Sequence, residues 1–332
     1  MKVDLSAVND IMLKAKMLGA LYTKQYKIPE HTYDTISDSS YDTSYHYNYI
    51  HIIKNDSTLI VVIPDETEVI DKGKLNEFIE EINEGVNIDI KVIGGNGLYS
   101  ADGLFMHIHA KSIDLSQFNS SNLANFEDFF CCTRLVGELI LDNFDTSNAI
   151  NMKNMFSDAL IYRIDMRNII TKNVTNMQGM FNSFIGILEN MNCMDTHNVI
   201  SMNNMFELSK IVRLDVSSFS FKSCSSTAGM FTGVKCEKLV LNMGRISKDL
   251  SALSMFSNAI IGTLDIKVSF ANCKVRTSLM FRSAKIENLN IKCTYDNTSF
   301  YKPFGCFHEA EIKNINAPDK LLELYNNRNI EV

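Results

Sequence analysis

One aromatic residue recurs along most of this chain at an almost constant interval. Nine phenylalanines are separated by gaps of 25 or 26 residues. They are Phe105, Phe130, Phe156, Phe181, Phe206, Phe231, Phe256, Phe281 and Phe307. Internal repetition at about 20–50 residues is typical of solenoids, propellers and arrays, in which each repeat packs on its neighbours. The period therefore restricts this chain to a repeat architecture.

The residues just before each phenylalanine have the spacing of a helical face. The residue immediately before it is apolar, as in Met155, and the residue four before it is often Met or Ala, as in Met152. Positions i, i+3 and i+4 share one face of a helical turn. Ser or Asn, such as Asn151, stands one residue ahead, and both are preferred N-cap residues. The spacing predicts a short capped helical turn in every repeat. Its Met and Phe side chains are expected to fill the core rather than to form a soft-metal ladder.

Aliphatic and polar residues alternate after each phenylalanine. Leu214 and Val216 follow Phe206 by eight and ten residues, and this alternation is typical of a short strand with one buried face. An Asn eight residues before the aromatic, such as Asn148, can bond the backbone of the turn between strand and helix. We therefore expect parallel strands stacked about 4.8 Å apart. The coil after Phe181 fits worst, because Glu189 falls where an aliphatic residue belongs.

The repeat is similar to a known family. Residues 139–148 read Leu-Ile-Leu-Asp-Asn-Phe-Asp-Thr-Ser-Asn and residues 151–156 read Asn-Met-Lys-Asn-Met-Phe, which closely resembles the BspA-like leucine-rich repeats of bacterial surface proteins and mycoplasma lipoproteins. Residues 195–206 match nearly as well, and the resemblance covers about residues 95–311. It implies a leucine-rich-repeat-like fold and protein binding or adhesion, and it implies no catalytic residues. We read no export signal or wall anchor in the sequence. In this respect the chain departs from the surface members of the family.

These patterns predict an α/β repeat solenoid with short parallel strands and short helical turns, capped by a small N-terminal α/β region. The expected divisions are an N-terminal capping region (1–86), a BspA-like solenoid of about nine coils (87–311) and a C-terminal cap (312–332). A cap is expected because the first coil of a solenoid otherwise exposes its core.

Both expected caps have sequence signals of their own. In the N-terminal region we expect helices over residues 4–22 and 75–82 and a hairpin whose second strand is 58–63. Gly94 to Gly97 are expected to form the turn into the first coil, although a phosphate-binding loop is the alternative. Pro318 is expected at the first position of a helix, and Leu321, Leu322, Leu324 and Tyr325 would then close the last coil.

Composition narrows the function classes. The net charge of −7 offers no general attraction to nucleic acid or to an anionic membrane. No apolar run is long enough to span a bilayer, and we expect a cytoplasmic protein. The eight cysteines include no CxxC pair, and only Cys193 and Cys293 share a column, four coils apart. We therefore expect free thiols, no metal and no cofactor. His107 and His109 could share one side of a strand as a metal pair, but no third ligand is evident.

A partner-binding surface is the strongest functional expectation. Polar residues alternate with the buried aliphatic ones, so they should form columns on the outward face of the strands. The candidates are Asp142, Asp165, Arg167, Asn190, Asn192, Asp215, Asn242, Asp265, Lys267 and Lys292, and the N-terminal tyrosines Tyr45, Tyr47 and Tyr49. The simpler interpretations are a solvated sheet face and a half-buried strand.

We accordingly expect a non-catalytic scaffold that docks a protein partner, with its oligomeric state left open. One alternative is an intracellular inhibitor, encoded by a phage or mobile element, that blocks a host nuclease or defence enzyme. The other is an enzyme with its site in the N-terminal region around His46, His51 and Asp56.

Overall fold

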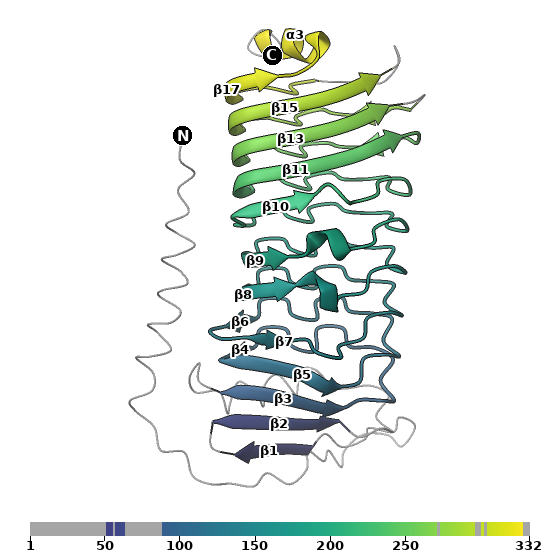
Figure 1. The fold of residues 1–332 in the computed structure, drawn as a ribbon, viewed down its shortest axis with the longest axis vertical. Coiled ribbons are helices and arrows are strands. Elements are labelled where there is room, and N and C mark those ends of the chain that lie inside the picture. The colour runs from purple at the N-terminus through teal and green to yellow at the C-terminus, as the bar shows by residue number, and fades with distance from the viewer. Residues whose placement is uncertain are drawn as a thin grey trace, which may run out of the picture.

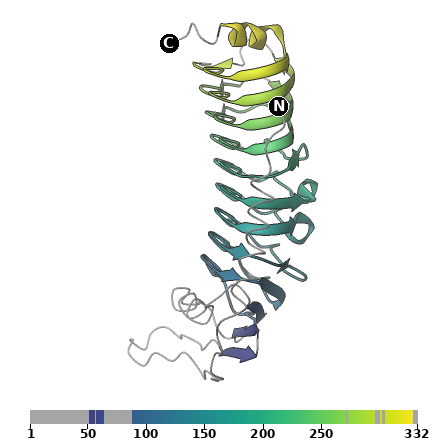
Figure 2. The same cartoon turned by 90° about the vertical axis from the view of Figure 1, so that its left-hand side faces the viewer.

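The described chain is a stack of parallel rungs. The computed structural model describes residues 51–55, 57–63, 88–270, 273–295, 300–301 and 304–327. The stack runs from β1 (His51–Asn55) at one end to α3 (Asp319–Asn326) at the other (Figure 1). Figure 2 shows the same rungs edge-on as thin, successive layers. The predicted parallel-strand repeat solenoid of about nine turns is therefore confirmed. The helices expected over residues 4–22 and 75–82 lie outside the described residues.

The strands form separate ladders along the stack. The first contains β1, β2 (Thr58–Ile63), β3 (Asp89–Gly94), β5 (Ser112–Phe118) and β7 (Leu139–Ile140). The second contains β4 (His109–Ala110), β6 (Arg134–Leu135), β8 (Leu160–Asp165) and β9 (Ile185–Glu189). The third contains β10 (Arg213–Val216), β11 (Lys235–Ile246), β13 (Ile260–Phe270), β15 (Lys285–Tyr295) and β17 (Glu311–Asn316). A short ladder pairs β12 (Leu250–Ser251), β14 (Val275–Arg276) and β16 (Phe300–Tyr301). Two 3-10 turns, η1 (Met166–Asn168) and η2 (Met191–Cys193), follow β8 and β9.

The strand register is the predicted one over most of the stack. Leu214 pairs in parallel with Leu239, which pairs with Leu264, which pairs with Leu289. These four side chains are at most 1% exposed. The predicted inward column is thus a continuous aliphatic stripe. The polar residues that alternate with the aliphatic ones along each strand face outward.

The predicted helical turns are wrong. The segment around each phenylalanine is a run of tight turns, because left-handed residues occur two positions before and two positions after it in all nine repeats. Their φ angles lie between 52° and 64°, as in Asn154 and Asp158 beside Phe156. The N–H of Met155 donates to the carbonyl of Met152 at 3.3 Å, so Asn154 takes the third position of a turn of the type II kind. A left-handed residue in every fourth position is incompatible with a continuing α-helix.

Every second residue of this turn segment bonds to the next coil. The N–H groups of Met152, Asn154 and Phe156 donate to carbonyls one coil further on, at 3.0, 2.9 and 2.8 Å. The residue expected as an N-cap, Asn151, accepts from the N–H of Lys153 at 3.1 Å through Oδ1, so the side-chain bond exists but begins a turn. The turn segment is therefore a second hydrogen-bonded wall of the solenoid, opposite the strands.

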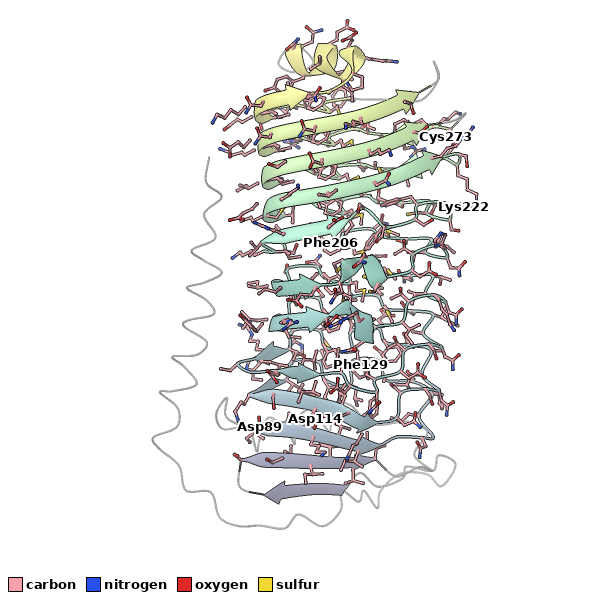
Figure 3. The ribbon with its side chains drawn as sticks, in the orientation of Figure 1. Asp89, Asp114, Phe129, Phe206, Lys222 and Cys273 are labelled. Atoms are coloured by element: carbon pink, nitrogen blue, oxygen red, sulfur yellow. The ribbon has the colours of Figure 1, made fainter. Side chains whose placement is uncertain are left out.

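The nine recurrent phenylalanines stack as one ladder between these walls. Their ring centroids are 4.9–5.7 Å apart from coil to coil, and the interplanar angles are 1–17°. Phe206 is fully buried in the middle of the ladder, and Figure 3 labels it within the stack. The predicted packing role of the Phe and Met columns is confirmed.

Side-chain amides join the coils at the corner before the turn segment. Nδ2 of Asn148 donates to the carbonyl of Ser121 at 2.7 Å, and Nδ2 of Asn173 donates to that of Ser147 at 2.8 Å. Asn122 and Asn198 make the same bond at 2.8 Å. The predicted bond from these asparagines to the backbone at the turn is thus present, and the carbonyl that accepts it belongs to the preceding coil.

At the N-terminal end, β1 and β2 form the predicted antiparallel hairpin, and β2 pairs in parallel with β3. The hairpin thus extends the solenoid sheet. Gly94 ends β3, and the N–H of Leu98 donates to the carbonyl of Gly95 at 3.1 Å, which closes a turn over Asn96 and Gly97 as expected of the entry to the first coil. The capping role of residues 1–86 stays a prediction, because most of that region lies outside the described residues.

At the C-terminal end, α3 closes the core. Leu321 is buried, and the ring of Tyr325 meets that of Phe307 edge-on at 5.6 Å. Tyr325 donates its hydroxyl to the carbonyl of Ile312 at 3.1 Å. Pro318 is the N-cap of the helix and not its first residue, which corrects the prediction by one position.

Candidate partner-binding surface

Six of the ten predicted sheet-face residues lie in strands, whereas Arg167 and Asn192 lie in η1 and η2, Asn190 precedes η2 and Asp142 follows β7. Asp142, Arg167, Asn192, Asp215, Lys267 and Lys292 are exposed, whereas Asp165, Asn190, Asn242 and Asp265 are half-buried. Asn242, Lys267 and Lys292 are direct neighbours in the parallel register of β11, β13 and β15, as predicted. Tyr45, Tyr47 and Tyr49 lie outside the described residues.

Three of the predicted residues form one hydrogen-bonded cluster. The Nε of Arg167 donates to both carboxylate oxygens of Asp165, at 3.1 and 3.0 Å. Asn190 donates from Nδ2 to Oδ1 of Asp165 at 2.8 Å. The Arg167 guanidinium, followed by the Asn190 amide, holds the pKa of Asp165 well below its usual range. This carboxylate is already satisfied by its neighbours, so it is poorly placed to bind a partner's cation.

Asn190 is displaced from its predicted column. The prediction placed it beside Asp165 in the strand register, but Asp165 pairs with Glu189. Arg163 follows its phenylalanine by seven residues and its partner Ile187 follows by six, so this coil reaches the sheet one residue early. Asn190, in a left-handed conformation (φ 54°), makes up the one-residue difference, so that Met191 is again buried in the core at the position that the repeat predicts.

Most sheet-face acids pair with a base on a neighbouring rung. Lys111 and Asp89 are 2.7 Å apart, Lys313 and Glu287 3.3 Å, and Lys285 and Glu311 3.2 Å. Arg163 and Glu189 form a further pair. Asp265 accepts from Asn290 at 2.8 Å and lies 3.8 Å from Lys238. Exposed ion pairs of this kind contribute little stability, but they neutralise much of the face.

A second set of bases faces like charges instead. Directly opposite neighbours in the parallel register are Lys210 with Lys235, Arg213 with Lys238, and Lys267 with Lys292. Among the described residues, only Lys238 of these six has a carboxylate within 4.0 Å. Like charges directly opposite in a sheet are destabilising. The sequence predictions included Lys267 and Lys292 but missed the other four residues. A comparison of the residues four and seven positions after each phenylalanine would have revealed them.

Charge is distributed unevenly along the face. The strands of the first two ladders, β1 to β9, contain four basic and four acidic residues, a net charge of zero. The strands β10, β11, β13, β15 and β17 contain eight basic and five acidic residues, a net charge of +3. The C-terminal half of the sheet is therefore basic although the whole chain carries −7.

A groove runs along the edge where the turn segments enter the sheet. We call it the edge groove. Its floor is formed by Arg134, Leu160, Ile185 and Lys210, which occupy the same position in four successive coils, and its wall by Asp158, Ser183 and Leu208. Its volume is about 290 Å³. Leu208 is 55% exposed and left-handed, at φ 56°. The sequence predictions missed this groove entirely.

Burial raises the thiol pKa of several cysteines. Burial raises the pKa of Cys131, whose sulfur lies 3.7 Å from that of Cys132, to about 12, and burial also raises that of Cys236 to about 12. The described cysteines form no disulfide. His107 is one of the left-handed turn residues, and buried Ile108 separates it from His109 in β4. No three His, Cys, Asp or Glu side chains in the described ranges are grouped to hold a metal ion.

The C-terminal core holds a small apolar cavity of about 40 Å³ beneath α3. Leu321 and Leu324 of the helix line it, together with Thr277 and the thiols of Cys293 and Cys306. Thr277 is 2% exposed, and within the described chain its hydroxyl has no hydrogen-bond partner. A buried hydroxyl in this state destabilises the fold.

Within the described ranges, the only α-helix, α3, has eight residues, and no helix has the length and apolar character needed to cross a membrane. No curated protein matches the chain significantly, and neither does any solved structure. Residues 99–185 and 164–266, which together cover half of the chain, match the family described as "Mycoplasma protein of unknown function, DUF285". The matched range contains seven of the nine stacked phenylalanines, so the match rests on the repeat itself. The chain thus belongs to this mycoplasma repeat family.

Proposed function

We propose that this protein is a non-catalytic scaffold that docks an acidic protein partner on the outward face of β10, β11, β13 and β15. The observation that carries the proposal is the set of three like-charge pairs in register, which lie on these strands except for Lys210, a bridge residue just before β10. A neighbouring carboxylate surface would neutralise charges that repel one another in the free protein.

The scaffold suits such a role because its charges are held at fixed intervals. Rungs stack about 4.8 Å apart, and both walls are hydrogen-bonded from coil to coil. Partner groups would therefore meet a surface that needs little ordering on binding. Repeat proteins commonly bind along surfaces of this kind. The resemblance of the repeat to the BspA-like leucine-rich repeats, which implies protein binding, supports the same function.

The test uses the full chain in matched charge variants. Proteins captured from a cell lysate by the wild-type chain are identified and purified, and their affinities are then measured directly. The test variant is Lys235→Glu with Lys238→Glu, and the control is Lys172→Glu with Lys222→Glu, which makes the same change in net charge at exposed positions away from the like-charge pairs. We expect the test variant alone to lose binding, and added salt to weaken binding of the wild type. Equal binding by both variants refutes the proposal.

A further inference from the structure

The edge groove has the pattern of a peptide-binding site. Its floor repeats one position of the coil, and the side chains along it are basic, apolar, apolar and basic in the order Arg134, Leu160, Ile185 and Lys210. Neither Arg134 nor Lys210 has a carboxylate partner among the described residues. Two apolar rungs thus lie between two cations that have no counter-charge of their own.

The spacing of the floor matches an extended chain lying along the solenoid axis. Arg134 and Lys210 are three rungs apart, about 14 Å at the usual strand spacing. In an extended peptide, residues i and i+4 are about 13 Å apart and point to the same side, with residue i+2 between them. A peptide with carboxylates at i and i+4 and an aliphatic residue at i+2 would meet both cations and cover Leu160 and Ile185.

The wall supplies apolar contact and one opposing charge. Leu208 exposes 55% of its surface beside the floor, more than a leucine in a filled core would. Asp158 contributes one negative charge, so the lining, with two cations and one carboxylate, carries a net +1. Its carboxylate accepts from the hydroxyl of Ser157 at 3.2 Å. An acidic ligand is therefore attracted to the groove as a whole but repelled at this one position.

We infer that the edge groove binds an extended segment of the partner with the pattern acidic–x–aliphatic–x–acidic. The inference rests on the proposed function and names the part of an acidic partner that would carry sequence specificity. The other like-charged residues of the sheet face would attract the partner in general, whereas the groove, which shares Lys210 with them, would select the segment because it combines charge with an apolar floor.

The probe is a labelled nine-residue peptide with blocked ends, with Glu at its third and seventh positions, Leu at its fifth and Ser elsewhere. Binding to the full chain is measured by fluorescence anisotropy. Replacing the central Leu by Ser, or both Glu by Gln, should weaken binding at least fivefold, since each change removes an apolar contact or an ion pair. A peptide of the same composition with Glu at the third and fourth positions is the spacing control and should also bind more weakly.

Protein variants test each part of the groove. Arg134→Glu and Lys210→Glu should each weaken binding of the probe about fivefold or more, and Asp158→Asn should strengthen it. Leu208→Asn should weaken binding without loss of thermal stability, because Asn tolerates the left-handed backbone better than Leu. Lys267→Glu, which lies outside the groove on the sheet face, should have the smallest effect of the three charge reversals.

The failures of the two proposals are distinguishable. If the probe does not bind, or if the Leu→Ser peptide binds equally well, the groove inference is overturned. Self-association of the chain that Arg134→Glu abolishes would also overturn it, since a second copy would then occupy the groove. In any of these cases the proposed function stands if acidic partners still lose affinity for the chain with Lys235→Glu and Lys238→Glu, and falls if they do not.

Discussion

Phe206 is the most direct test of the stacked core. Its side chain is fully buried, and its ring centroid lies 5.5 Å from those of both Phe181 and Phe231, with interplanar angles of 9° and 2°. Phe206→Ala should lower the free energy of unfolding by about 3–5 kcal/mol, the usual cost of deleting a buried phenylalanine. Phe206→Leu keeps most of the apolar volume but removes both ring contacts, at about 0.5–1.5 kcal/mol each, so about 1–3 kcal/mol is expected.

The assay must follow individual coils. The chain contains no tryptophan, so urea unfolding is followed by far-ultraviolet circular dichroism, and hydrogen exchange read by mass spectrometry assigns the change to particular repeats. In a solenoid each repeat contacts only its neighbours. Protection should therefore fall most in the coils of Phe181, Phe206 and Phe231. A break in the middle of the stack should also let the two halves unfold separately, which would appear as a loss of cooperativity.

A surface change in the same repeat is the control. Ile200 is 52% exposed, and Ile200→Ala should change stability by less than about 0.5 kcal/mol. If Phe206→Ala is equally mild, or if protection falls uniformly from end to end, then the stacked-ring register is wrong.

Three further perturbations test other features. Gly179→Ala should lower the free energy of unfolding by more than about 1 kcal/mol, because φ is +63° and the new methyl group would overlap the amide oxygen of Asn154. Gly244→Ala is the control, because Gly244 has a similar φ of +61° but open space around it, so that only backbone strain is introduced. Equal losses of stability in the two variants would show that the overlap with Asn154 contributes nothing. Thr277→Val should raise the thermal midpoint, because it removes a buried hydroxyl that has no hydrogen-bond partner in the described chain. Thr227→Val should lower the midpoint, because the Thr227 hydroxyl donates to the carbonyl of Ser251 at 3.3 Å. A shift of the same sign in both variants would contradict this reasoning. Arg167→Gln should raise the pKa of Asp165, observed by carboxyl NMR titration. Since the folded pKa is depressed, the stabilisation that Arg167 confers is full above about pH 4 and lost as pH falls below it, and a pH-independent difference in urea midpoint would contradict this.

The solenoid could be predicted because its determinants are periodic. Phe206 and its eight counterparts fix the repeat length, and alternation such as Leu214, Asp215 and Val216 fixes which side of each strand is buried. Both are properties of a column as a whole, so a single poor copy does not obscure them.

The turn conformation was not predicted because two backbones present the same pattern. Buried residues at i, i+3 and i+4, such as Met152, Met155 and Phe156, fit a helical turn and also a pair of overlapping tight turns. The position two before the aromatic distinguishes them. It is Gly, Asn or Asp in seven of nine copies, residues that enter the left-handed region most readily, and Leu279 is the least expected exception.

The candidate site was only partly predictable. The outward positions of Asp215 and Lys267 follow from alternation. The displacement of Asn190 depends on a one-residue shift of the strand register that is made up again within the same coil, so the repeat length does not reveal it. The edge groove combines residues from four coils, three of them at the first position of a strand, and their types differ from coil to coil, so strand periodicity gives no signal for the groove.

The coil-to-coil bonds of the turn segment also bear on how such a chain can change in length. Because Met152, Asn154 and Phe156 bond to the next coil through backbone groups, one coil can follow another with little regard to its side chains. Gain or loss of one 25-residue unit by recombination would therefore leave the remaining joints intact. It would also move Arg134 and Lys210 apart or together by one strand spacing, about 4.8 Å, if it fell between them. The number of coils between these two residues would thus set the length of the segment that a descendant of this protein could bind.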